Sequence, residues 1–125
     1  MKDSTAHLHL IYEDFKRTLD FYKSEIPFFK KRLEEITIKN AGENVLKQVE
    51  HFENTFIAMN ENLDVLLHDV NLKQDALLKE AKAKPEFTNL KVNVTADDLK
   101  TLIDFTTKEF TTTKENFYRF LSDHL

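Results

Sequence analysis

Residues 45–70, which read VLKQVEHFENTFIAMNENLDVLLHDV, decide the fold class of this chain. Apolar side chains recur there in alternating steps of four and three residues, at Val45, Val49, Phe52, Phe56, Met59, Leu63, Leu66 and Val70. Such spacing lines up one narrow apolar stripe along a helix. The stripe lapses at Lys73 and resumes at Leu77, and Pro85 follows it as a stop signal. The pattern predicts a helix over residues 43–83.

A second stripe with the same spacing lies nearer the N-terminus. It occupies Leu8, Tyr12, Phe15, Leu19, Tyr22, Ile26, Phe29, Leu33 and Ile36. These positions predict a helix over residues 5–39. Pro27 lies inside it and removes one backbone hydrogen bond, so a kink is expected there. The alternative is two helices separated at Pro27, but the stripe keeps its phase across the proline, which favours one kinked helix.

A third stripe predicts a last helix over residues 95–124, with Thr95 as its N-cap. Its members are Leu99, Ile103, Thr106, Phe110, Thr113, Phe117 and Phe120. Residues 84–94 lack a helical period and are predicted to form a linker. The connection at residues 40–43 is short, so the first two helices must be antiparallel neighbours. The sequence thus predicts one all-α domain over residues 1–125, an up-down-up antiparallel bundle of three long helices with coiled-coil-like seams.

Composition narrows the classes of function. The chain has 125 residues, a net charge of −4, one Gly and no Cys. The lack of cysteine excludes disulfides, thiol catalysis and cysteine-based zinc sites. There is no basic stripe of the kind that binds nucleic acid, no nucleotide loop and no cofactor motif. No apolar run approaches the length of a membrane span, and residues 1–7 lack the apolar core of a signal peptide. We therefore expect a soluble cytoplasmic protein that binds neither nucleic acid nor a membrane.

One weak pattern of polar residues suggests a metal site. His9 and Glu13 are four residues apart in the first predicted helix, and Asp64 and His68 have the same spacing in the second. If Ile36 packs near Val45, antiparallel pairing places Glu13 level with His68, and His9 and Asp64 within a turn of them. Two imidazoles and two carboxylates at one level can chelate Zn²⁺ or Fe²⁺. The competing interpretation is ordinary surface decoration, because all four residues flank the apolar stripes and such pairs are common on helices.

A second polar level lies at Pro27. The same register places Pro27 level with Asn54 and Thr55, and Thr113 of the third helix lies there too. A kink beside small hydroxyl groups could frame a pocket for a small molecule. The simpler interpretation is that each threonine hydroxyl bonds back to the preceding turn and packs as a small residue.

Three segments of the sequence carry a resemblance to a known group of proteins. They are Val49-Glu50-His51-Phe52-Glu53-Asn54-Thr55-Phe56-Ile57, the pair His68-Asp69, and the ending Phe117-Tyr118-Arg119-Phe120-Leu121-Ser122. Together they resemble small, uncharacterised helical proteins of Bacteroidetes bacteria, over most of the chain. The resemblance implies a cytoplasmic bacterial protein, and it supplies no functional residues to carry over.

The absence of a catalytic motif favours a non-enzymatic function. The second helix is predicted to be longer than the first, which leaves Leu77 and Leu78 without cover. Further apolar residues in the predicted linker share this position, at Phe87, Leu90, Val92 and Val94. The leading hypothesis is therefore a helical module that binds another protein or a second copy of itself as a homodimer. The alternative is a metal-binding bundle that uses His9, Glu13, Asp64 and His68.

Overall fold

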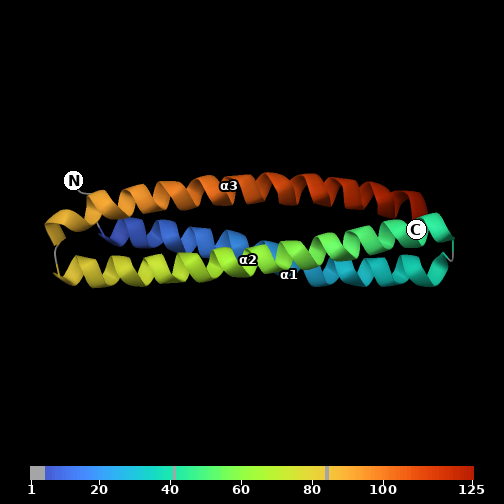
Figure 1. The fold of residues 1–125 in the computed structure, drawn as a ribbon, viewed down its shortest axis with the longest axis horizontal. Helices are drawn as coiled ribbons and strands as arrows, with labels where there is room; N and C mark the ends of the chain where they lie inside the picture. The colour runs from blue at the N-terminus through green and yellow to red at the C-terminus, as the bar shows by residue number, and fades with distance from the viewer. Residues whose placement is uncertain (1–4, 41, 84) are drawn as a thin grey trace.

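The computed structural model describes residues 5–40, 42–83 and 85–125, with the side chains of residues 81, 83 and 85–95 left out. The described residues form three helices and no strand. They are α1 (Thr5–Lys39), α2 (Glu43–Ala83) and α3 (Pro85–His124). The helices run side by side along the long axis, with α1 and α3 in one direction and α2 in the other (Figure 1). The predicted all-α, up-down-up bundle is confirmed.

Helix α1 is continuous through Pro27. A proline inside a helix costs about 3 kcal/mol or more, through the lost hydrogen bond and a clash with the preceding turn. On either side of it, Ile26 and Phe29 are buried in the same apolar stripe, while Pro27 itself is exposed. Burial of the stripe offsets the cost, because an interruption at Pro27 would turn one half of the stripe away from the core. The prediction of a single helix over residues 5–39 is therefore confirmed.

The core follows the predicted seams closely and is richest in aromatic rings near one end. Phenylalanine rings from all three helices meet there with centroids 5.0 to 6.1 Å apart, mostly tilted or edge-on: Phe29, Phe52, Phe56, Phe110, Phe117 and Phe120. Such geometries suit the ring quadrupole, and each ring buries a large apolar area. This cluster joins all three helices.

The predicted linker over residues 84–94 is wrong, because α3 begins at Pro85. Proline is well tolerated in the first turn of a helix, where its missing N–H has no intrahelical partner to lose. Thr95 consequently lies inside α3 and is not its N-cap. The prediction missed that Val92, Ala96 and Leu99 continue the α3 stripe in steps of four and three residues, so the helical spacing extends into this segment.

The apolar overhang expected at the end of α2 is also corrected. Leu77 is fully buried, so the chain covers it without a partner. Leu78 is 42% exposed. The side chains of Phe87, Leu90, Val92 and Val94 lie outside the described residues. The expected overhang is thus contradicted at Leu77 alone, while Leu78 is exposed as expected.

The C-terminal ends of α1 and α3 are tied together by Asn40. Its backbone N–H donates to the carbonyl of Ile36 at 2.9 Å. Its side-chain Nδ2 donates to the same carbonyl at 3.2 Å and to the carbonyl of His124 at 3.3 Å. Helix ends leave such carbonyls without intrahelical partners, so one asparagine satisfies both ends.

Candidate functional site

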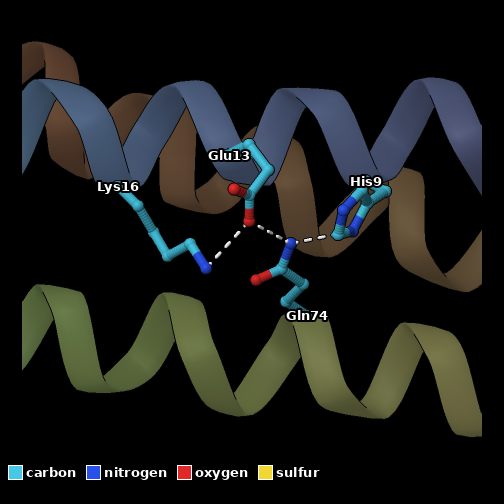
Figure 2. Close-up of polar contacts among 4 residues, drawn as sticks. All are labelled: His9, Glu13, Lys16 and Gln74. Carbon is cyan, nitrogen blue, oxygen red and sulfur yellow. Dashed lines mark hydrogen bonds and ion pairs between the residues drawn. The ribbon is translucent and has the colours of Figure 1, made fainter.

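The most polar buried position of the bundle is Gln74 of α2, which is 5% exposed. Its side chain reaches across to α1 between His9 and Glu13 (Figure 2). The amide nitrogen lies 2.8 Å from Nδ1 of His9 and 2.8 Å from Oε2 of Glu13. Because an amide nitrogen carries two hydrogens, it can donate to both, which makes Nδ1 of His9 the acceptor and leaves the ring proton on Nε2.

Lys16 completes this cluster on α1. Its Nζ lies 2.8 Å from the same Glu13 oxygen that Gln74 contacts (Figure 2). The hydrogen bonds from Lys16 and from Gln74 lower the pKa of the Glu13 carboxyl below its ordinary value of 4.5. Glu13 is thus held as a carboxylate that accepts two hydrogen bonds, and Gln74 and Lys16 both serve to position it.

The structure brings His9 and Glu13 together but separates them from Asp64 and His68. Asp64 pairs with Lys23 of α1, and it lies ten residues from Gln74, about 15 Å along the helix. His68 is exposed on α2. Among the described residues, no group of three or more His, Cys, Asp or Glu side chains could hold a metal ion.

The prediction that these four residues lie at the same height in the bundle is therefore wrong, because it assumed the wrong axial register between α1 and α2. Glu13 lies level with Gln74, not with His68. The register agrees with the aromatic core, where the rings of Phe29 and Phe56 are 5.2 Å apart. Large rings fix the axial position of two helices because they fill specific holes in the facing helix. Metal binding as such stays a prediction.

Sequence reasoning missed Gln74, although a signal was present. The residue lies four positions after Val70 and three before Leu77, which is the spacing of the apolar stripe. The interruption of the apolar stripe, which was assigned to Lys73, is thus Gln74, a polar residue in a core position. A polar residue at such a position often fixes the register of packed helices at some cost in stability.

Tyr12 lies next to Glu13 in the chain and is fully buried. Of the buried side-chain polar atoms in the described residues, its hydroxyl is the one without a hydrogen-bond partner. Burial, and then the negative charge of Asp69, raise the pKa of this hydroxyl above its ordinary value. A buried hydroxyl without a hydrogen-bond partner costs free energy, so the Tyr12 hydroxyl destabilises the core.

The pocket predicted near Pro27 corresponds in part to a groove in the structure. Thr55 and Thr113 line a groove of about 510 Å³ between α2 and α3, but Pro27 and Asn54 do not line it. The Thr55 hydroxyl donates to the backbone carbonyl of His51 at 2.9 Å. For Thr55 the simpler interpretation, a hydroxyl satisfied by its own helix, is thus confirmed.

A different surface exposes aromatic side chains on the side where α1 faces α3. We call it the α1–α3 face and define it by the residues that line its two hollows, of about 570 and 330 Å³: Phe21, Tyr22, Glu25, Phe28, Phe29, Arg32, Phe110, Thr111, Lys114, Glu115, Tyr118, Leu121, Ser122 and Leu125. Four of its large side chains are strongly exposed, with Phe21 at 56%, Phe28 at 65%, Tyr118 at 49% and Leu125 at 57%. These residues lie outside the apolar stripes, so the seam analysis gave no reason to group them.

Three of the four charged residues of this face, Glu25, Arg32 and Lys114, are paired within the chain. Lys114 of α3 lies 2.7 Å from Glu25 of α1, and this hydrogen bond raises the pKa of Lys114. The same ammonium lies 5.4 Å from the centre of the Tyr118 ring. Arg32 pairs with Glu35 one turn away. Most of the charge on the face is thus already paired within the chain.

No protein-family model, no curated protein and no solved structure matches this chain. The resemblance to helical proteins of Bacteroidetes bacteria therefore stays a prediction. Within the described residues, none of the helices is both long and apolar enough to span a membrane.

Proposed function

We propose that this protein is a non-enzymatic helical module that associates with a second copy of itself through the α1–α3 face. The observation that carries the proposal is the exposure of Phe21, Phe28, Tyr118 and Leu125 around two hollows. Monomeric proteins seldom expose contiguous apolar patches larger than a few hundred Å², and such patches mark interaction sites. Aromatic residues and arginine are also the types enriched at the energetic centre of interfaces.

The charge of the face favours a second copy over a strongly charged partner. The residues that line it include two acids, Glu25 and Glu115, and two bases, Arg32 and Lys114. The side-chain charges of the face thus sum to zero, although the whole chain carries a net charge of −4. Two copies can approach through it without net repulsion, whereas other surfaces of the two chains would repel each other weakly.

The layout of the face suits a two-fold arrangement. Tyr118 lines both hollows and therefore lies between them. A two-fold axis near Tyr118 places the larger hollow of one copy over the smaller hollow of the other, and the reverse. Phe28 of each copy then fills the hollow beside Phe21 of its partner. Such a contact closes on itself, so a dimer and not a filament is the expected product.

Sedimentation velocity over about a hundredfold range of protein concentration tests the proposal. We expect a monomer–dimer equilibrium in the natural protein. Phe28→Ser should weaken it about thirtyfold or more, as expected for an aromatic residue at the centre of an interface. Val65 of α2 is exposed to the same extent as Phe28 and lies outside the face, so Val65→Ser is the matched control.

The two variants give clear outcomes. If the natural protein stays monomeric over the whole range, self-association is wrong. If Val65→Ser weakens the dimer as much as Phe28→Ser, the interface lies elsewhere on the surface. Circular dichroism of both variants checks that the exposed substitutions leave the bundle folded. A cytoplasmic location, as expected from the sequence, is part of this proposal.

A further inference from the structure

The groove between α2 and α3 has the dimensions of a small-molecule site. Its volume of about 510 Å³ falls in the range of roughly 300 to 1,000 Å³ that is typical of ligand pockets. Its lining runs from Thr55 to Leu66 on α2 and from Leu102 to Thr113 on α3. This groove shares only Phe110 with the α1–α3 face and opens between α2 and α3, so it can be tested separately from the proposed self-association.

Thr106 gives the groove an unpaired polar group. Its side chain is 7% exposed, and its hydroxyl makes no hydrogen bond to the described part of the chain. By contrast, Thr101 donates to the carbonyl of Asp97 at 3.1 Å, as Thr55 does to its own helix. Among the described residues, only the Tyr12 hydroxyl is both without a hydrogen-bond partner and fully shielded from solvent. The Thr106 hydroxyl, which also has no partner, is therefore accessible, and it opens into the groove that Thr106 lines.

The other groups of the groove indicate what would bind there. Phe105, which is 61% exposed, and the buried Phe110 offer ring surfaces, and Met59 offers a thioether. Aromatic rings pack favourably on both kinds of group. Glu109 is three residues from Thr106 and also lines the groove, so the two are neighbours on one side of α3. A carboxylate only accepts hydrogen bonds, and a hydroxyl can accept one as well.

We infer that the α2–α3 groove binds a small planar aromatic molecule that carries an amine. The rings lie against Phe105 and Phe110, and the amine donates to the Thr106 hydroxyl and to the Glu109 carboxylate. An aromatic carboxylate of the same size is disfavoured, because its charge repels that of Glu109 and it offers no hydrogen to either group. The groove thus selects by the polar substituent as well as by the ring.

Fluorescence titration of the full-length protein with 1-aminoanthracene tests this site. We expect saturable binding, and weaker binding of anthracene-1-carboxylate, which has the same rings. Thr106→Val keeps the shape of the side chain and removes the hydroxyl, so the affinity for the amine should fall about fivefold. Thr112→Val is the matched control, because Thr112 is exposed on the same helix and does not line the groove.

A second pair of variants tests whether the ligand occupies the volume of the α2–α3 groove. Ala58 is exposed and lines the groove, so Ala58→Phe should fill it and abolish binding without disturbing the core. Asn54→Phe adds the same ring outside the groove and should leave the affinity unchanged. Non-saturable binding, equal affinity of the two anthracenes, or full affinity in Ala58→Phe would each overturn the assignment. None of these results depends on whether the protein dimerises.

Discussion

The amide nitrogen of Gln74 on α2 lies 2.8 Å from the carboxylate of Glu13 on α1, so a core position of one helix is bonded to the flank of the other. The pair fixes an axial register that the apolar stripes leave free to slide by a turn. It also explains why a glutamine occupies a position that a leucine would fill in a plain bundle.

Replacing Gln74 by leucine should leave the bundle as stable as the natural protein or more stable by about 1 kcal/mol. The substitution removes a buried amide, and the released Glu13 and His9 remain partly exposed and can bind water. Urea unfolding measures the change. A loss of more than about 2 kcal/mol would show that the polar cluster contributes net stability, contrary to this account.

The contribution of Glu13 to stability should depend on pH. Its pKa in the folded protein is lowered by hydrogen bonds from Lys16 and Gln74, from the ordinary value of 4.5. A lowered pKa means that the stabilisation is present above pH 4.5 and is lost as the pH falls through the folded value. Glu13→Gln should therefore destabilise the protein at neutral pH but much less near about pH 3. Urea unfolding at both pH values checks this, and an equal effect at the two would exclude the linkage.

Two tyrosine-to-phenylalanine substitutions should change stability in opposite directions. Tyr12→Phe removes a sealed hydroxyl without a partner, so the free energy of unfolding should rise by about 1 kcal/mol. Tyr22→Phe removes a hydroxyl that donates to Thr107 at 3.0 Å, so it should fall by a similar amount, about 1 kcal/mol. Thermal or chemical unfolding distinguishes them. Destabilisation by Tyr12→Phe would indicate that the hydroxyl has a partner such as a buried water.

Pro27→Ala should stabilise the protein. The backbone at Pro27 is helical, so alanine can adopt it and restore a donor to the carbonyl of Lys23. The gain of up to about 3 kcal/mol is reduced by about 1 kcal/mol, because alanine leaves the unfolded chain more flexible. We expect a rise of about 2 kcal/mol in the free energy of unfolding. A decrease would mean that the proline sets a bend on which the packing depends.

Titration with Zn²⁺ checks the register at the predicted metal site. Asp64 pairs with Lys23 well away from His9, so we expect no micromolar site that needs both His9 and His68. Calorimetry of His9→Ala and His68→Ala variants provides the comparison. A micromolar affinity that is lost in both variants would contradict the observed register.

Three helices and most of the residues that they bury were predictable from the periodicity of the sequence alone. Steps of four and three residues specify one stripe per helix, and the short connection after α1 specifies antiparallel neighbours. These are local properties, because periodicity depends only on the geometry of one helix. The same reasoning was misapplied at residues 84–94, where the step from Val92 to Ala96 and Leu99 already continues the α3 stripe.

The axial register of the helices, and with it every candidate site, depends instead on how the helices pack together. A stripe looks much the same one turn further along, so periodicity cannot choose between registers that differ by a turn. The choice came from particular shapes, such as the contact of Phe29 with Phe56, and from Gln74 reaching Glu13. The α1–α3 face and the open hydroxyl of Thr106 likewise depend on which side chains of two helices meet. That is a property of packing, which no single helix contains.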